Sequence, residues 1–310
     1  MNPFDETPES PQDPAPAADG PLPEKELIAG PMTSSEDAAA ELQPHAQFVP
    51  AAPVFPEDLQ ITWSWPHFIL FIFFGFASLI FIQSVLAVHY APQNKHLTTS
   101  QLQEYLLSKP QFAIGSMLIW YAAIFFFLYV TLSVLRGQSF WESLGWRSLK
   151  TRPGELPRNP FVYFASGCGL SLFVALLSAR MKTPENLPME ELFKYRQVAL
   201  MFMAMAVLVA PLVEETLFRG YLYPLFARSF GVWPAVLLTG ILFGLMHGAQ
   251  LGWTWSLVTI LVMVGVIFTL VRARTGSVLA SYLMPLGYNS LISLFAVLGT
   301  HGFTKLPVSH

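Results

Sequence analysis

The chain has few charged residues, a single cysteine and no aspartate in its apolar part. Only 12% of its 310 residues are charged and 53% are hydrophobic, so a soluble domain could not hide its apolar surface from water. The lone Cys168 excludes an intramolecular disulfide and a cysteine-based zinc site. No aspartate follows Asp58, which excludes an aspartyl dyad. The HExxH motif of zincins and the GxSxG motif of serine hydrolases are also missing.

The first 58 residues have a composition of their own. They hold twelve of the 25 prolines, twelve acidic residues and one base, Lys25, which gives a net charge of −11. Such a stretch has too little apolar side chain to offset the entropy of folding, and we predict a disordered tail over residues 1–60. Its start is acidic and interrupted by proline, unlike a secretory signal, so we expect the first apolar run to be retained.

Seven apolar runs follow, and most are long enough to cross a hydrocarbon core of ~30 Å as a helix. They cover residues 65–89, 112–135, 160–179, 198–213, 232–247, 255–271 and 278–298. We predict an all-α fold, a polytopic membrane helix bundle of about seven transmembrane helices with a disordered N-terminal tail. Its parts are the tail at 1–60, the N-terminal transmembrane helices with a basic loop at 61–159, the core helices at 160–300 and a C-terminal tail at 301–310.

Lysine and arginine in the loops predict the orientation, because short basic loops face the cytoplasm. The loops after the second and sixth runs hold Arg147, Lys150, Arg152, Arg158, Arg272 and Arg274. We expect these loops and the N-terminal tail on the cytoplasmic side of a bacterial inner membrane. The loop after the third run opposes this orientation with four bases, Arg180, Lys182, Lys194 and Arg196.

Four polar residues interrupt apolar sequence at positions where charge is costly. Glu214, Glu215 and Arg219 end the fourth run, and His247 closes the fifth. Ionisable groups in membrane helices mark functional sites by default. Positions four apart share a helix face, so Glu215 can pair with Arg219, whereas Glu214 is turned by about 100°. The structural alternative is that Arg219 and His247 snorkel to the lipid headgroups.

This division predicts two roles for the glutamates. Glu215, held by Arg219, braces the helix, and the unpaired Glu214 is available as a general base. Together with His247 it could hold or polarise a water molecule, which is the chemistry of a hydrolase. In a transporter or proton relay the carboxylates would instead titrate along a pathway, but no internal repeat is visible in the sequence.

Taken together, these residues resemble the motifs of a known family. Glu-Glu-x-x-x-Arg at 214–219 and Phe-x-x-x-His at 243–247 are similar to the first two motifs of the CPBP family. That family comprises type II CAAX prenyl endopeptidases and bacterial relatives described as intramembrane metalloproteases or bacteriocin self-immunity proteins. The resemblance extends over about residues 140–299 through three further features, the stretch FWESLGWR at 140–147, the Thr-Gly-Ser turn at 275–277 and Asn289.

The resemblance implies roles for five residues. It makes Glu214 and His247 the groups that activate water, Glu215 and Arg219 their support, and Asn289 a donor to the oxyanion. No cofactor is required on this mechanism. Zinc remains an option, and its ligands would be Glu214 and His247. Without a second histidine, these ligands are fewer than a zinc site usually has.

The chain departs from the family at the third motif. Where the family has a histidine four residues before the asparagine, this chain has Pro285. Loss of one oxyanion donor costs ~10²- to 10³-fold in rate, which weakens or alters a hydrolase. Tyr282 lies on the same helical face as Asn289, so its hydroxyl is one replacement, although tyrosines in membrane helices more often pack or anchor.

We therefore expect an integral membrane endopeptidase of the CPBP type that hydrolyses peptide bonds in an intramembrane cavity. The alternative is a catalytically impaired pseudoprotease, a membrane scaffold or an immunity protein that kept the fold. The expected partners are membrane lipid and a peptide or protein substrate, which the resemblance implies to be prenylated in the CAAX branch of the family. No nucleic-acid partner is expected.

Counting residues along the helices raises a spatial question about the site. We expect the fourth helix to run past the glutamates and stop at Pro224. With the fifth helix returning through the membrane, Glu214 and His247 then lie ~15–20 Å apart. A shared water requires a helix that starts deeper, tilts or bends, and Pro211, Pro224 and Pro234 are candidate breaks.

Overall fold

The structure is a computed structural model that describes residues 56–92, 97–149, 159–181 and 193–303, all within one compact unit. Every regular element in these residues is a helix, and six helices are long and apolar enough to cross a membrane. The predicted all-α membrane bundle is confirmed, and the protein is an integral membrane protein. The predicted tail up to residue 55 and the loop bases Lys150, Arg152, Arg158 and Lys182 lie outside the described residues.

The helices agree closely with the predicted runs. Two spans consist of several helical segments, Pro110–Val134 of α3, α4 and η2, and Arg196–Phe230 of α7, α8, η4 and α9. The run at 232–247 forms a helix of only 15 residues, shorter than the other spans. In chain order the elements are η1 Glu57–Leu59, α1 Trp65–Tyr90, α2 Thr99–Leu107, α3 Pro110–Ala113, α4 Gly115–Leu128, η2 Tyr129–Val134, α5 Phe140–Ser143, α6 Pro160–Ser178, α7 Arg196–Leu208, α8 Ala210–Glu215, η4 Thr216–Leu222, α9 Tyr223–Phe230, α10 Val232–Met246, α11 Trp255–Thr275 and α12 Val278–Gly299.

The fourth span differs most from the prediction. The expected stop at Pro224 is wrong, because the helix runs on as α9 to Phe230. The π-helical segment η4 places Pro224 in the first turn of α9, where no backbone N–H is needed from it. Pro211 follows the break between α7 and α8, and Pro234 lies in the first turn of α10. The chain therefore turns back towards α10 only at Gly231.

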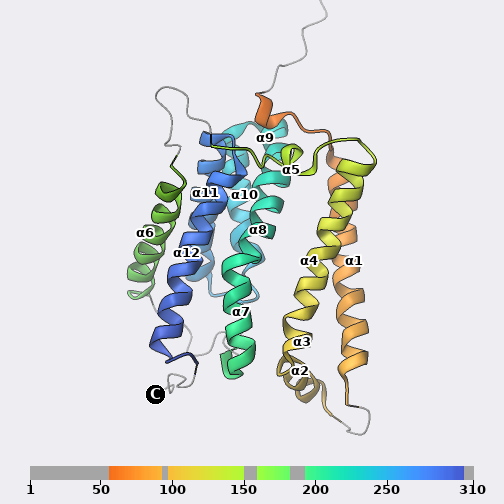
Figure 1. The fold of residues 1–310 in the computed structure, drawn as a ribbon, viewed down its shortest axis with the longest axis vertical. Helices are drawn as coiled ribbons and strands as arrows, with labels where there is room; N and C mark the ends of the chain where they lie inside the picture. The colour runs from red at the N-terminus through yellow and green to blue at the C-terminus, as the bar shows by residue number, and fades with distance from the viewer. Residues whose placement is uncertain (1–55, 93–96, 150–158, 182–192, 304–310) are drawn as a thin grey trace, which may run out of the picture. The chain divides into compact units, whose positions relative to one another are not determined.

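Glycines let two pairs of helices approach closely. Gly167 on α6 and Gly287 on α12 each face a carbonyl of the other helix, and a methyl group added at either would overlap it. Gly240 and Gly244 on α10 face the backbone of α11 in the same way. Small residues are the usual means by which membrane helices come this close. Figure 1 shows α6 beside α12 on one side of the bundle and α1 beside α4 on the other, with α7 and α8 between them.

The segment before α1, residues 57–64, is fixed to the core, and we call it the N-terminal strap. Oδ2 of Asp58 lies 3.0 Å from Nη1 of Arg272, whose side chain is fully buried. The adjacent Glu57 pairs with Arg147 at 2.7 Å, but its side chain is 80% exposed. These ion pairs hold the start of the strap in place. The predicted disordered tail over residues 1–60 therefore extends too far, because it includes the first residues of the strap.

Replacing Asp58 with alanine is expected to destabilise the protein by about 3 kcal/mol, because Arg272 would remain buried without its carboxylate partner. Thermal unfolding of the protein in detergent should show this as a lower Tm. Glu57→Ala is the matched control, since its pair with Arg147 is exposed and contributes about 0–1 kcal/mol. Equal Tm values for the two variants would contradict a stabilising role for the buried pair.

Candidate active site

Glu214 and His247 face each other at the same depth in the bundle. Oε1 of Glu214 lies 3.9 Å from Nε2 of His247. Glu214 precedes the turn at Gly231 by seventeen residues and His247 follows it by sixteen. Because both segments are helical and have the same rise per residue, the two residues lie at the same distance from the turn along the helix axes, roughly 25 Å. The expected separation of 15–20 Å is wrong because it assumes that the fourth helix stops at Pro224.

Glu215 and Arg219 form a buried ion pair, as their spacing predicts. Nη1 of Arg219 lies 2.9 Å from Oε1 of Glu215, and neither side chain is more than 1% exposed. Arg219 also donates hydrogen bonds to the hydroxyl of Thr269 at 3.2 Å and to the carbonyl of Gly265 at 2.9 Å, both on α11. The pair thus ties α8 and η4 to α11, and Arg219 does not snorkel to the surface.

Phe243 links this ion pair to the histidine. The centroid of its ring lies 4.6 Å from the guanidinium carbon of Arg219, within the range of a cation–π contact. The same ring lies 4.8 Å from the imidazole ring of His247, measured between centroids. The carbonyl of Phe243 accepts a hydrogen bond from Nδ1 of His247 at 2.8 Å. The Phe-x-x-x-His spacing therefore fixes the orientation of the imidazole.

That hydrogen bond also determines the tautomer of His247. A carbonyl only accepts, so Nδ1 carries the proton, and Nε2 of the neutral ring is an acceptor that faces Glu214. Two acceptors 3.9 Å apart suit one water molecule that donates to both. Two hydrogen bonds of ~2.8 Å at a tetrahedral angle span roughly 4.6 Å. The side chains of Glu214 and His247 are 22% and 21% exposed, so water can reach both.

A cavity of about 270 Å³ lies beside the pair. Side chains from α4, α7, α8, α10, α11 and α12 line it. Glu214, His247 and Asn289 are among them. Glu215 and Arg219 are not, because they are buried in the contact with α11. The structure thus places three of the five predicted site residues at one cavity and the other two in the packing that supports it.

Helix α12 brings Pro285 and Asn289 to this cavity. Nδ2 of Asn289 donates to the carbonyl of Ala206 on α7 at 2.8 Å, which leaves one of its two N–H groups for another acceptor. Pro285 offers no polar side-chain atom, and α12 continues through it. The hypothesis that Tyr282 replaces the missing histidine is wrong, because this side chain does not line the cavity and packs instead on Trp146, with ring centroids 5.4 Å apart.

The stretch 140–147 and the turn 275–277 support the site from one end of the core. The indole N–H of Trp146 donates to the hydroxyl of Thr216 in η4 at 3.1 Å. The hydroxyl of Ser277 donates to a carbonyl of the stretch and also caps the first turn of α12. Together these two segments hold η4 and the α11–α12 turn against each other.

One further residue at the cavity lies outside every sequence motif. Tyr121 on α4 lines the same cavity as Glu214. It is one of ten tyrosines and stands in an apolar run, more than ninety residues before Glu214. The only signal in the sequence was a general one, that the hydroxyl of a tyrosine buried in a helix bundle usually has a polar role.

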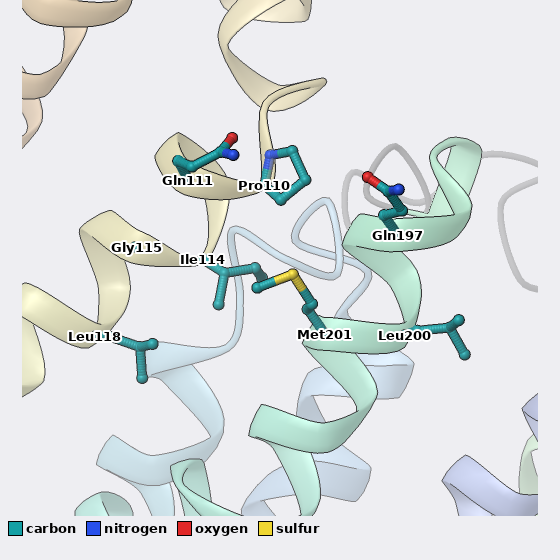
Figure 2. A pocket seen from close by; sticks show the side chains of 8 residues that line it. All are labelled: Pro110, Gln111, Ile114, Gly115, Leu118, Gln197, Leu200 and Met201. Carbon is teal, nitrogen blue, oxygen red and sulfur yellow. The ribbon is translucent and has the colours of Figure 1, made fainter.

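A second hollow lies between α3–α4 and α7, and Figure 2 shows Gln111 and Gln197 on its two sides. Its other lining residues are Pro110, Ile114, Gly115, Leu118, Leu200 and Met201. Met117 and Phe202, next to it on the same helices, line the cavity at Glu214. The two hollows therefore adjoin along α4 and α7, but the second one contains no ionisable side chain.

The residues gathered at the cavity do not fit a zinc site. Catalytic zinc is usually held by three protein ligands. In the part of the chain that the structure describes, no three His, Cys, Asp or Glu side chains come together. Glu214 and His247 are only two ligands, and Glu215 is engaged by Arg219.

Comparison with known proteins agrees with the motifs. Residues 196–291 match the model of the family described as type II CAAX prenyl endopeptidase Rce1-like. The matched segment contains all five predicted site residues and extends from the start of α7 into α12. No curated protein and no solved structure matches the chain. The match over this segment supports membership of the CPBP family, which the resemblance of the motifs predicts.

Replacing Arg219 with methionine is expected to destabilise the protein by about 3–5 kcal/mol, because Glu215 would be left buried as an unpaired charge. The Tm in detergent measures this loss. The double variant Glu215→Gln/Arg219→Met should recover part of it, since no charge then remains unpaired. Glu214→Gln makes the same chemical change one residue earlier, at the cavity, and should leave the Tm near that of the wild type. A double variant no more stable than Arg219→Met would contradict the buried pair.

Proposed function

We propose that this protein is an intramembrane endopeptidase that hydrolyses peptide bonds in the cavity beside Glu214. The observation that carries the proposal is the approach of Glu214 Oε1 to His247 Nε2, 3.9 Å apart at the cavity wall. The description of the matched family, type II CAAX prenyl endopeptidase Rce1-like, supports a protease. The base and the imidazole are therefore arranged for attack by water.

In the proposed reaction, a water molecule held between Glu214 and His247 attacks the carbonyl carbon of the scissile bond. Glu214 accepts a proton as the new C–O bond forms, and the carbonyl oxygen becomes an oxyanion. The remaining N–H of Asn289 donates to that oxyanion. The C–N bond then breaks, and Glu214 returns the proton to the leaving amine. Peptide and water thus give a carboxylic acid and an amine.

Glu215 and Arg219 act in this reaction by positioning. They lie outside the cavity lining, and their ion pair holds α8 against α11. Because successive helical residues are about 100° apart, fixing the face of Glu215 also fixes the direction of Glu214.

The family description makes a prenylated peptide that ends in a CAAX sequence the first substrate to test. A peptide precursor of another kind is the second. We place the protein in a bacterial inner membrane with its N-terminal tail in the cytoplasm, on the evidence of the basic loops. Its partners are then membrane lipid and a peptide or protein substrate, with no role for nucleic acid.

A catalytically impaired scaffold or immunity protein is the second candidate, and one observation favours it. Pro285 lines the cavity where the family has a histidine, and it adds no hydrogen-bond donor. A protein that kept the fold and lost turnover would have this combination.

Glu214→Gln is expected to lower kcat by about 10²- to 10⁴-fold, because the amide cannot accept the proton of the attacking water. His247→Ala should cause a loss in the same range. The measurement is cleavage of a fluorogenic peptide panel, including a farnesylated CAAX peptide, by the protein in detergent. The Tm of each variant is the control for folding.

Pro285→His separates the two candidate functions in the same assay. It restores a donor at the cavity, so turnover should rise above that of the wild type if the protein is a weakened protease. Wild-type activity that Glu214→Gln leaves unchanged would refute the proposed mechanism. Absence of turnover in the wild type and in Pro285→His would refute the protease and support the scaffold.

Treatment with EDTA is expected to leave peptide cleavage unchanged, because the proposed reaction uses Glu214 and His247 without a metal ion. The measurement is kcat before and after dialysis against the chelator, with a zinc-dependent protease treated in parallel as the control. Strong inhibition that is reversed by added zinc would overturn this mechanism.

A further inference from the structure

Peptide hydrolysis needs donors directed at the carbonyl oxygen as it gains charge, and this cavity has few. In the proposed reaction Glu214 and His247 face the water as acceptors. Pro285 has no donor, and Asn289 has one N–H left after its bond to α7. Ser293 lies one turn beyond Asn289 on α12, farther along the cavity wall.

Tyr121 is a further donor in the lining of this cavity. Its side chain comes from α4 and lines the same cavity as Glu214, His247 and Asn289. Its hydroxyl forms no hydrogen bond with another residue in the described part of the chain. The phenolic O–H is therefore available to a substrate in the cavity.

The backbone around Tyr121 is well anchored. The indole N–H of the adjacent Trp120 donates to the carbonyl of Gly75 on α1 at 3.0 Å, and its ring contacts that of Tyr121 at 5.7 Å. A donor on a helix that is fixed in this way keeps its direction, which is what stabilisation of a developing charge requires.

Tyr288, the other tyrosine at the cavity, is less suited to this role. It is buried on α12 with its ring edge against Phe268, at a centroid distance of 6.2 Å. The cavity therefore contains one phenol supplied by α4 and one that packs between α11 and α12.

We propose that Tyr121 is a further catalytic residue, whose phenolic O–H donates a hydrogen bond to the substrate carbonyl oxygen as it becomes an oxyanion. Together with Asn289 it forms a two-donor oxyanion site, with α4 supplying the donor that α12 lacks at Pro285. The phenol keeps its proton throughout, so it takes no part in the transfer between water, Glu214 and the leaving amine. This inference rests on the proposed endopeptidase function.

The test is Tyr121→Phe in the fluorogenic peptide assay, which removes one oxygen and keeps the ring. Its kcat should fall by about 10²- to 10³-fold, while KM changes little, because the bond strengthens only in the transition state. Tyr129→Phe, on the same span but half-exposed and outside the cavity lining, is the matched control and should keep wild-type kcat. Both variants should keep the wild-type Tm.

The pH dependence of kcat separates a donor to the oxyanion from a residue that positions the base. The acid limb, set by Glu214 in the proposed reaction, should stay in place in Tyr121→Phe. A displaced acid limb, an unchanged kcat, or a loss confined to KM would each overturn the role of Tyr121 and leave the endopeptidase intact. A wild-type protein without turnover would overturn the proposed function, and this inference with it.

Discussion

The buried ion pair of Glu215 and Arg219 is the constraint on which the rest of the site depends. Two charges removed from water, and here from a bilayer as well, are costly unless every group finds a partner. Arg219 meets this condition through Glu215, the hydroxyl of Thr269, the carbonyl of Gly265 and the ring of Phe243. These partners lie on three helices, so the pair holds α8, α10 and α11 in one arrangement.

Close approach of α10 and α11 is what lets one guanidinium reach both helices. Gly240 and Gly244 bring the backbone of α10 against α11, and a methyl group at either would overlap its neighbour. Gly265 gives Arg219 its carbonyl, and a methyl group there would meet Phe243 at 3.0 Å. The glycines therefore act on the chemistry indirectly, because they set the distance between the helices that position the guanidinium and the imidazole.

Features that depend on neighbours along the chain were readable in the sequence, and those that depend on distant packing were not. Composition predicted the membrane bundle, and the four-residue spacing predicted the pair of Glu215 and Arg219. The relative depth of the site residues was misjudged, because the π-helical segment that accommodates Pro224 forms in the packed bundle and leaves no local pattern. Tyr121 was missed for a similar reason, since the cavity that it shares with Glu214 is lined by helices far apart in sequence.

The chemistry of membrane helices explains why a tyrosine suits the role of a hydrogen-bond donor in this cavity. Each polar side chain in a helix bundle must be desolvated, and a group that carries or readily takes up charge is more costly there than a neutral hydroxyl. A phenol pairs one neutral donor with an apolar ring that packs like its neighbours. In the proposed reaction Tyr121 would therefore supply a neutral donor to the cavity that Pro285 lines, without adding an ionisable group there.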